Sequence, residues 1–497
     1  MELFTIGFPA AFGVEPLLYC LLGVTLGTLI GVLPGIGPLA TISILLPVTF
    51  GLPPAYALIM LAGVYYGSQY GGSTTAILIN LPGEASSVVT AIDGYQMAKQ
   101  GRAGVALFMA TMSSLVGSAV GIIALMVLSP LLAKVVLTFG AGEFFAVLVL
   151  GLIAAASISS AGALKGIAMV MVGLLLGCVG MESNTGVARF YFGQYQLYEG
   201  IDVVILAMGL FGITEIIHSV GTPATKAFTD KIALRSMVPS WSDIRQSTWP
   251  SLRGSGIGAF FGVLPGTGPM LASFFSYMVE KRVTKTPERF GHGAIEGVVG
   301  PEAANNAAVP TAFIPMLTMG IPGNATMAVM LGAMMMHGIT PGPLLMQDHP
   351  ELFWGLVASF WIGNIMLLVL NIPLIGIWVR LITVPYHLLY PIIVVLICIG
   401  VYVIHNSVFD LGLVIAISAL GYLLRPLGFE PAPLILGFIL GPMMEVNLRR
   451  ALLLSNGDYM ALFQRPVSGI ILSAAILIIL WKASAAFGLV RRKRPAA

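Results

Sequence analysis

Long apolar runs constrain this chain more than any other feature of its sequence. Four stretches carry at most one charged residue each: Ala103–Leu132, Phe144–Val179, Leu352–Trp378 and Val467–Trp481. A membrane-spanning helix needs about 20 such residues. Charged residues make up 9% of the chain, against about 25% in soluble domains. The sequence therefore predicts an all-α polytopic integral membrane protein with roughly ten to twelve membrane segments.

The few charges indicate how the chain is oriented in the membrane. Basic residues crowd one short segment, which contains Lys281, Arg282, Lys285 and Arg289. A second basic run is Arg491–Arg494. By the positive-inside rule both are expected in the cytoplasm, which places the C-terminus there. The first 16 residues carry only Glu2 and Glu15; they lack the basic region of a signal peptide and are expected outside.

One motif occurs twice: GVLPGIGP at residues 31–38 returns as GVLPGTGP at residues 262–269, an offset of 231. The same offset places the glycine series 23, 27 and 31 on the series 254, 258 and 262. Such small residues at every fourth position favour close helix packing rather than ligand binding. Downstream, LPGEAS (81–86) matches IPGNAT (321–326) at an offset of 240. Two features in the same order indicate an internal duplication.

The duplication predicts three parts. Residues 1–225 form a first repeat half with a tip at 34–38, residues 226–253 form a basic cytoplasmic connector, and residues 254–497 form a second half with a tip at 265–269. Charges before and after the two copies differ in sign, because acids precede the first break and Arg235, Arg245 and Arg253 precede the second. An inverted repeat explains this reversal. A duplication in the same sense, with misleading loop charges, is the alternative.

The length between basic residues predicts hairpins rather than full crossings. Arg253 and Lys281 enclose only 27 residues, 254 to 280, whereas two crossings need roughly 40. If both flanks are cytoplasmic, this segment enters the membrane and returns, with its tip at Pro265–Pro269. The first copy, about residues 17 to 50 by alignment, would enter from the opposite face. Simple proline kinks are the alternative to these two opposed re-entrant helical hairpins.

A PGxGP break exposes backbone groups that bind ions. Proline stops a helix, glycine allows close approach, and the broken ends leave free carbonyls for a cation and free amides for a carboxylate. The residues expected to bind substrate at the two tips are Gly35, Ile36, Gly37, Gly266, Thr267 and Gly268. The residues expected at the cation are Pro34, Gly83, Pro265, Glu302 and Gly323.

Two stretches are unusually polar for their apolar surroundings: YYGSQYGGSTTAILINLPGEASS (65–87) and GPEAANNAAVPTAFIPMLTMGIPGNAT (300–326). Neutral donors in this density suit recognition of carboxylate oxygens. The substrate candidates here are Ser73, Thr74, Thr75, Asn305, Asn306, Asn324 and Thr326. Alternatively these hydroxyls and amides only cap broken helices. Glu302, the acid of the second stretch, is either a proton or sodium ligand or an interfacial residue without a transport role.

The remaining features are weaker. The group His405, Asn406 and Asp410 is either a proton relay or a polar loop. Three separate cysteines, Cys20, Cys178 and Cys398, indicate small core residues rather than disulfides or a metal site. No nucleophile–base pair, metal-binding motif or phosphate loop is present, so an enzyme is disfavoured and no cofactor is expected apart from sodium ions. Nothing in the sequence indicates nucleic-acid binding.

Four segments together resemble one family. The stretches GTLIGVLPGIGPLATISILLP, YYGSQYGGSTTAILINLPGE, DGYQMAKQGRAG and PEAANNA with IPGNATMA look like the large transmembrane subunit, TctA, of tripartite tricarboxylate transporters. The resemblance runs from about residue 15 to residue 480. It implies a bacterial inner-membrane protein that works with a small four-helix membrane subunit and a periplasmic solute-binding protein.

The same resemblance implies cation-coupled secondary uptake of carboxylates such as citrate, commonly with sodium. Its glycine- and proline-rich signature maps onto Gly23, Gly27, Gly31, Pro34, Gly35 and Gly37. The expected function is therefore that of a permease subunit with alternating access. The rival from another class is a channel, because broken helices also build selectivity filters. A membrane-embedded transferase is a third alternative, but the acidic metal-binding motif expected of one is missing.

Overall fold

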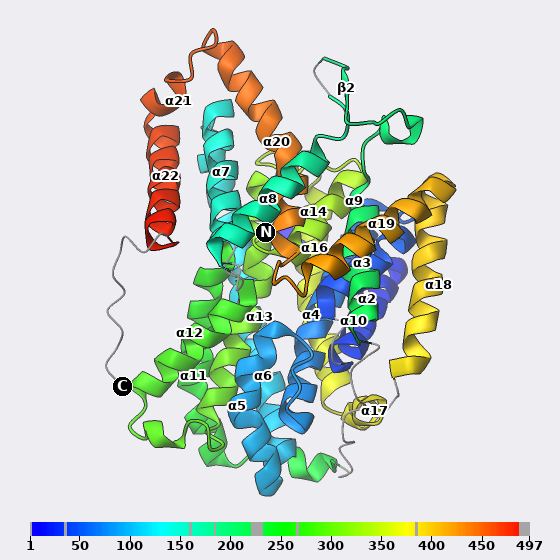
Figure 1. Cartoon of the computed structure of the whole chain (residues 1–497). Helices are drawn as coiled ribbons and strands as arrows, with labels where there is room; N and C mark the ends of the chain where they lie inside the picture. The colour runs from blue at the N-terminus through cyan, green and yellow to red at the C-terminus, as the bar shows by residue number, and fades with distance from the viewer. Residues whose placement is uncertain are drawn as a thin grey trace. The chain divides into compact units, whose positions relative to one another are not determined.

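Helices make up most of the computed structural model, which describes residues 2–33, 37–158, 162–182, 185–219, 232–264, 268–382 and 386–486 (Figure 1). In this part of the chain the strands are limited to β1 (Gly180–Met181) and β2 (Ala188–Arg189), which pair as a short antiparallel hairpin. The all-α class expected from the sequence is confirmed.

The chain forms two units, and each combines two separate stretches of sequence. Unit 1 contains Met1–Lys134 and Val204–Tyr422, and unit 2 contains Val135–Val203 and Leu423–Ala497. Each unit thus takes residues from both of the expected repeat halves. Units and halves are different divisions of the chain, and the boundaries of the halves stay a prediction.

Unit 1 holds helices of very different length. They are α1 (Phe8–Ala11), α2 (Val14–Val32), α3 (Gly37–Thr49), α4 (Pro54–Ile79), α5 (Val88–Met97), α6 (Ala103–Val136), α9 (Val203–Ala207), α10 (Thr214–Ser219), α11 (Trp241–Val263), α12 (Gly268–Val283), α13 (Glu296–Met319), α14 (Ala325–Met336), α15 (Leu345–Asp348), α16 (Pro350–Asn371), α17 (Ile375–Leu381), α18 (Tyr386–His405) and α19 (Val408–Leu424). Short 3-10 turns occur at Ala85–Ser87, Leu234–Met237 and Pro287–Arg289, and π turns at Leu3–Gly7, Ala98–Arg102 and Met208–Ile213. The helices α6, α9 and α19 extend past the unit boundary by one or two residues.

Two helices of unit 1, α4 and α13, are buried on every side. All residues from 57 to 78 in α4 and from 297 to 318 in α13 are buried. A helix that is enclosed in this way is a core helix, not one that faces lipid along one stripe. Both end in the left-handed conformation that stops a helix, at Asn80 (φ 58°) and at Gly320 (φ 71°). These two positions are 240 residues apart, the offset of the second motif.

The glycine series pack helices against these two cores. A methyl group on Gly23, Gly27 or Gly31 of α2 would come within 3.0 Å of the carbonyl oxygens of Met60, Val64 and Ser68 on α4. Methyl groups on the matching glycines of α11 would meet the carbonyls of Gly300, Ala304 and Ala308 on α13 in the same way. Because each carbonyl pair is 240 residues apart, both halves use the same packing. The close-packing role expected for the glycine series is confirmed.

The hairpin arms are present on either side of each break. α2 packs on α3, and α11 packs on α12. Arg253 on α11 pairs with Glu280 on α12 through two contacts, Nη2 to Oε2 at 2.5 Å and Nε to Oε1 at 2.8 Å. The ends of the segment 254–280 therefore lie side by side, as a helical hairpin requires. The tip residues 34–36 and 265–267 lie outside the described residues.

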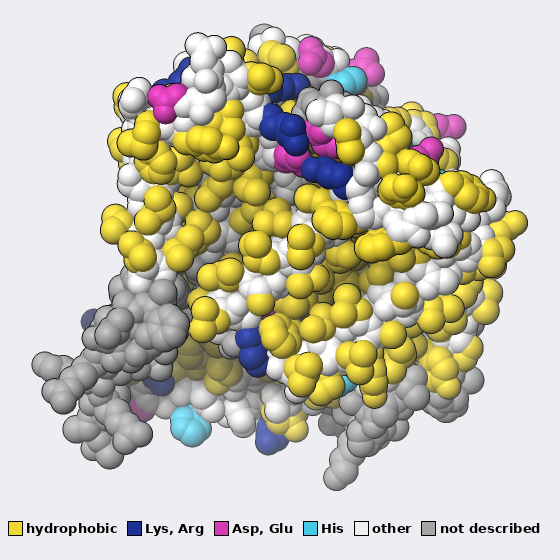
Figure 2. Space-filling view, turned by 45° about the horizontal axis from the view of Figure 1, so that its top comes forward, with side chains coloured by type: hydrophobic (Ala, Val, Ile, Leu, Met, Phe, Trp, Pro, Cys, Tyr) yellow, Lys and Arg dark blue, Asp and Glu magenta, His cyan; other side chains and the backbone are white. Residues whose placement is uncertain are grey.

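Apolar surface is abundant on the described chain. Among the described residues, three helices are long and apolar enough to cross a membrane: Val14–Val32, the continuous helical run Ala85–Val136, and Pro350–Asn371. Shorter apolar helices accompany them, so the number of membrane segments stays a prediction. Hydrophobic side chains cover most of the face seen in Figure 2, and charged side chains gather near its upper margin. Exposed apolar surface of this extent is typical of a protein embedded in lipid.

The described residues of unit 2 form the short strand pair, a 3-10 turn at Tyr195–Leu197 and the helices α7 (Ala141–Ile158), α8 (Ala163–Gly177), α20 (Ala432–Leu454), α21 (Ala461–Gln464) and α22 (Pro466–Ala486). α20 packs on α7 and α8, and α22 packs on α7. Arg189 of β2 binds both carboxylate oxygens of Glu445 on α20, at 2.9 and 3.1 Å, which fastens the strand pair to the helix. Glu445 also pairs with Arg449 one turn later at 3.0 Å.

The cysteines differ from their expectation in part. Cys20 is buried, Cys178 is half-buried and Cys398 is exposed, and all three are free thiols. Cys398 lies on α18, whose neighbouring residues Leu396 and Ile399 are also exposed. An apolar run alone does not distinguish a core face from an outward face of a membrane helix, and this is why the prediction of a core position fails for Cys398.

Candidate functional site

Buried polar side chains from α4, α5, α6 and α13 meet in unit 1, and Glu302 of α13 is at their centre. Glu302 is fully buried, at 0% exposure. Its Oε2 accepts hydrogen bonds from the hydroxyls of Ser73 on α4 (2.7 Å) and Ser114 on α6 (3.3 Å). Its Oε1 accepts one from Thr90 on α5. Full burial places the Glu302 carboxylate in the protein interior, and its role as a proton or sodium ligand stays a prediction.

Two asparagines extend this cluster along α13. Asn305 Nδ2 lies 3.5 Å from Glu302 Oε2, a long hydrogen bond. Asn306 Nδ2 donates to Ser114 Oγ (2.8 Å), to Asn305 Oδ1 (2.6 Å) and to the backbone oxygen of Glu302 (3.0 Å). Asn306 Oδ1 is buried and has no donor among the described residues. An unpaired acceptor beside a carboxylate favours a ligand that carries a positive charge or a proton.

The Glu302 carboxylate has no basic counter-charge within the described ranges. The ion pairs there involve other acids, and the groups that contact Glu302 are neutral hydroxyls and an amide. Burying an unpaired carboxylate is costly, and neutral donors offset only part of that cost. A cation or a proton bound at this place would supply the remainder.

A small cavity adjoins the cluster. Its volume is about 10 Å³, and it is lined by Tyr70, Ser73, Thr74, Leu107, Ala110, Thr111 and Ser114. One water molecule needs roughly 10–15 Å³ by this measure. The cavity therefore has room for a single small polar species beside the two serines that bind Glu302.

In each half, the second PG break packs against the glycine-rich helix of the same half. A methyl group on Gly83 would come within 3.0 Å of the Gly31 carbonyl oxygen, and one on Gly323 would lie 3.6 Å from the Gly262 carbonyl oxygen. Both glycines were expected at the cation. In the structure they bring each PG break against the last turn of the helix that precedes the corresponding tip, and their role at a cation stays a prediction.

Glu84 and Asn324 occupy matching positions after these breaks, 240 residues apart. Each has extended backbone and precedes a helical turn. Asn324 Oδ1 accepts from the backbone amide of Met327 (2.9 Å), which caps α14, and its Nδ2 lies 3.1 Å from Tyr65 Oη on α4. Glu84 Oε2 and Gln69 Nε2 are buried and unpaired within the described residues.

Other predicted residues are dispersed or make local contacts. Gly37 and Gly268 begin α3 and α12 with positive φ (64° and 60°), and Gly268 lies beside Asn324. Thr74 and Thr75 donate to carbonyls of their own helix, those of Tyr70 and Gly72, as the capping alternative anticipates. Thr326 is buried in the first turn of α14. The predicted residues Pro34, Gly35, Ile36, Pro265, Gly266 and Thr267 lie outside the described residues.

Sequence reasoning missed several members of the site. Thr90 and Ser114 bind Glu302 directly, and Gln69, Glu84 and Tyr65 lie at the breaks. Ser114 was visible as a polar residue within the apolar run 103–132, where such residues are costly unless they bond inward. Thr90 gave no comparable signal, because its contact depends on how α5 packs on α13.

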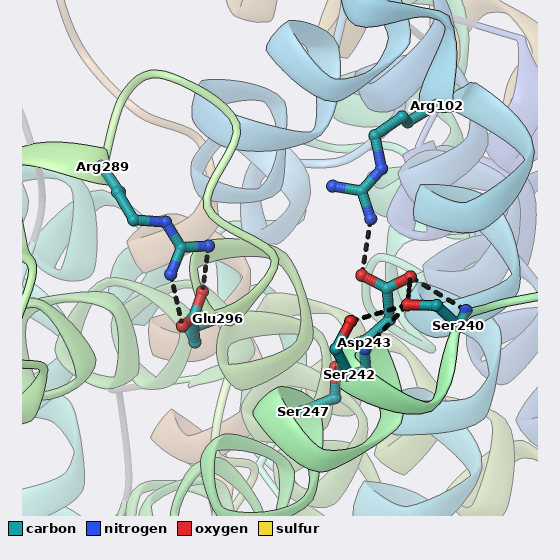
Figure 3. A network of polar contacts seen from close by, with 7 residues as sticks. All are labelled: Arg102, Ser240, Ser242, Asp243, Ser247, Arg289 and Glu296. Atoms are coloured by element: carbon teal, nitrogen blue, oxygen red, sulfur yellow. Dashed lines mark hydrogen bonds and ion pairs between the residues drawn. The ribbon is translucent and has the colours of Figure 1, made fainter.

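Polar contacts also hold the start of α11 and α13 in unit 1 (Figure 3). Ser240 caps α11: its hydroxyl accepts from the Asp243 amide (3.2 Å), and the Asp243 carboxylate accepts from the Ser240 amide (3.0 Å). Arg102 Nη2 lies 2.5 Å from Asp243 Oδ1. Burial alone would raise the pKa of Asp243, but the Ser240 hydroxyl and amide and the Arg102 guanidinium together hold it below its ordinary value. Arg289 pairs with Glu296 at 3.2 Å.

The remaining candidates stay apart from this chemistry. His405 Nδ1 lies 2.8 Å from Asp410 Oδ2 at the connection between α18 and α19, and the histidine side chain is 41% exposed. That exposure fits a polar loop better than a buried relay. No group of three or more His, Cys, Asp or Glu side chains that could hold a metal ion occurs in the described ranges.

Comparison with known proteins agrees with the family resemblance seen in the sequence. The model of the Tripartite tricarboxylate transporter TctA family matches residues 17–436. The chain is 50% identical over 478 residues to a 52.8 kDa protein of Agrobacterium vitis, described by its place in the TAR-I ttuC' 3' region; the match covers 96% of this chain and 94% of that protein.

A second protein of Agrobacterium vitis, from the TAR-II ttuC' 3' region, is 52% identical over 223 residues. That match covers 45% of this chain and 92% of the relative. No solved structure matches the chain.

Proposed function

Because the chain belongs to the tripartite tricarboxylate transporter TctA family, a family of transporters and not of enzymes, we propose that it is the membrane permease subunit of a secondary transporter. It takes up di- or tricarboxylates such as citrate together with a coupling cation, sodium, by alternating access. It works with a small four-helix membrane subunit and a periplasmic solute-binding protein in a bacterial inner membrane, with the N-terminus periplasmic and the C-terminus cytoplasmic.

The buried acidic cluster carries this proposal. Glu302 has neutral donors and no basic partner in the described chain. A substrate carboxylate that enters the same region adds a second negative charge, and two such charges repel strongly at low dielectric. A cation held at Glu302 cancels this repulsion. Substrate and cation then bind together or not at all, which is the physical basis of symport.

Cross-contacts between the halves support an inverted repeat. Ser73 of α4 binds Glu302 near the start of α13, while Tyr65, earlier on α4, binds Asn324 beyond the end of α13. The two helices therefore run antiparallel, although they hold equivalent places in the two halves. Packing is also reciprocal, since the 3-10 turn Ala85–Ser87 contacts α12 and α14 contacts α3. Copies related by a two-fold axis make such exchanged contacts.

The hairpin arms support alternating access by movement of one body. α2, α3, α11 and α12 all belong to unit 1. Both predicted tips, which would meet near the membrane midplane, are therefore carried by the same unit as Glu302. A unit that carries the whole site and moves against a scaffold would expose it to each side in turn.

Uptake into proteoliposomes tests the proposal. The purified chain is reconstituted with its small subunit, the binding protein is added outside, and radiolabelled citrate uptake is followed with and without an inward sodium gradient. We expect accumulation above the external citrate concentration only with the gradient. Sodium-independent equilibration would support the channel alternative instead, because a channel cannot concentrate solute.

Replacements at the tips give a second test. Leucine at Gly35 or Gly266 should abolish uptake while the protein still inserts into the membrane, because a bulky side chain blocks the backbone amides expected to bind the carboxylate. Alanine at Gly256, where no atom lies within 4 Å of an added methyl group, is the matched control. Normal uptake by either leucine variant would contradict the assignment of the tips.

A further inference from the structure

A second buried carboxylate of unit 1, that of Asp93 on α5, is enclosed by donors from the second half of the chain. Its Oδ1 accepts hydrogen bonds from three backbone amides, those of Gly291 (2.8 Å), Gly293 (2.8 Å) and Ala294 (2.9 Å). Its Oδ2 accepts one from the hydroxyl of Tyr277 on α12 (2.9 Å). Asp93 itself is fully buried, at 0% exposure.

The loop before α13 is shaped around this carboxylate. Gly291 and Gly293 have positive φ, 89° and 99°, which helps to turn the amides of Gly291, Gly293 and Ala294 toward one point. A methyl group on Gly297, in the first turn of α13, would come within 3.0 Å of Asp93 Oδ2. The carboxylate therefore fits closely against both the loop and the start of the helix that carries Glu302.

Asp93 lies one helical turn after Thr90, so both side chains project from the same face of α5. Thr90 donates to Glu302, and Asp93 binds the loop that leads into the same helix. Gly94, one turn after Thr90 near the same face, brings α5 against α4, because a methyl group on Gly94 would lie 2.7 Å from Ile77 Cγ1. The two polar contacts on one face, together with the close approach of Gly94 to α4, fix the register of α5 along α13.

We propose that Asp93 is a positioning residue for the cation site: by holding α5 in register with α13, it determines where the Thr90 hydroxyl meets the Glu302 carboxylate. The inference rests on the proposed function in one respect, that Glu302 holds the coupling cation. Loss of the Asp93 carboxylate releases α5 from the loop and moves the Thr90 hydroxyl away from Glu302 Oε1. The set of hydrogen-bond donors around the cation then changes.

The chain offers a matched control for this contact. Gln100, which follows α5, donates from Nε2 to the His292 carbonyl oxygen (2.8 Å) in the same loop. This contact holds the loop but lies in the π turn beyond the end of α5 and does not involve the Thr90 turn. A variant at Gln100 therefore separates loop stability from the register of α5.

The transport test compares Asp93→Ala, Thr90→Val, their double variant and Gln100→Ala in the reconstituted complex. The readouts are the sodium concentration that gives half-maximal citrate uptake and the KM for citrate. We expect Asp93→Ala and Thr90→Val each to raise the sodium requirement about tenfold or more, as loss of outer-shell partners does at metal sites, with a smaller change in KM. The double variant should be no worse than either single one, and Gln100→Ala should match the unchanged protein.

Asp93→Asn provides a conservative comparison, because its amide oxygen still accepts from the backbone amides. It should recover part of the sodium affinity lost in Asp93→Ala. Additive effects in the double variant, or an unchanged sodium requirement in Asp93→Ala, would overturn the positioning role while the uptake function stands.

Amide hydrogen exchange of the purified protein tests the positioning role of Asp93 independently of any transport assay. Asp93→Ala should speed exchange in residues 88–97 as well as in 290–297, and Gln100→Ala should speed it only in the loop. Unchanged protection of 88–97 in Asp93→Ala overturns the inference, even if the unchanged protein shows no sodium-driven uptake and the proposed function fails. Should Asp93→Ala not fold, Asp93→Asn carries the same comparison.

Discussion

The two halves of the chain share one backbone plan and differ in their chemistry. α2 packs on α4 as α11 packs on α13, with carbonyls 240 residues apart facing the glycines. The side chains at matching positions do not agree, because Glu302 corresponds to Ala62, Asn305 to Tyr65 and Asn324 to Glu84. Close packing has to be satisfied in each copy, whereas one acid at the centre is enough for a site. The predicted duplication thus accounts for the shared packing, whereas the central acid comes from the second half and its hydroxyl donors come from the first.

The largest effect is expected from breaking the shared packing. Gly27→Ala and Gly258→Ala each force a methyl group against a backbone carbonyl that cannot turn away, at a cost of about 3 kcal/mol in each half. Thermal unfolding in detergent and the yield of monodisperse protein measure the loss. Gly256→Ala on α11, whose added methyl group meets nothing within 4 Å, should be neutral. Equal stability of the Gly256 and Gly258 variants would contradict the shared packing.

Next in size is the loss of the acid that distinguishes the halves. Glu302→Gln keeps the shape of the side chain but removes the negative charge, so sodium-driven uptake should fall about 100-fold. Citrate uptake in proteoliposomes is the measurement. Glu296→Gln, on the same helix but paired with Arg289 outside the cluster, should stay within about twofold. Retention of sodium dependence by Glu302→Gln would place the cation elsewhere.

A smaller effect concerns the matching positions Glu84 and Asn324. Asn324 caps α14 through the Met327 amide, so Asn324→Ala should lower stability by about 1 kcal/mol. Asn324→Asp preserves the cap and makes the two halves alike, and its unfolding temperature should match the unchanged protein. If Asn324→Ala and Asn324→Asp lower the unfolding temperature equally, the hydrogen bond from Asn324 to Tyr65 contributes more to stability than the cap.

The smallest effect is at the start of the hairpins, where the halves differ in capping. α2 begins at Gly13 without a side-chain cap, whereas α11 begins at Ser240 with the Asp243 cap. The pKa of Asp243 is lowered in the folded state. Its carboxylate therefore stabilises the protein above the ordinary value of 3.8, and that contribution is lost as the pH falls through the lowered pKa.

Because the pair is partly exposed, Asp243→Asn should cost less than about 1 kcal/mol at neutral pH. The difference in unfolding temperature between this variant and the unchanged protein should shrink toward about pH 3. A difference that stays constant with pH would mean that the charge of Asp243 does not contribute.

Sequence reasoning reached the parts of this structure that local rules decide. The close packing of the glycine series follows from its spacing. The ion pair of Arg253 with Glu280 agrees with the expected hairpin, while its tip and the bounds of the two halves stay predictions. The capping alternative was right for Thr74 and Thr75 because a hydroxyl in a helix has a carbonyl of its own helix in reach.

What escaped the sequence depends on contacts between distant segments. Thr90 and Ser114 bind Glu302 across 212 and 188 residues, and the amides around Asp93 come from a loop about 200 residues away. The spacing of residues along the sequence does not indicate which segments that far apart come into contact. The two units also combine segments from both halves, an arrangement that the duplication does not predict.

That interleaving has a consequence for synthesis. The first segment of unit 2 ends at Val203, and its second segment begins at Leu423. At about 5–20 residues per second, α7 and α8 leave the ribosome on the order of ten seconds or more before α20 and α22, on which they pack. During that interval the two helices stand in the bilayer without their later partners, with Glu143 and Lys165 as their charged residues. A chaperone or insertase that shelters this pair would act in that interval, before α20 and α22 are made.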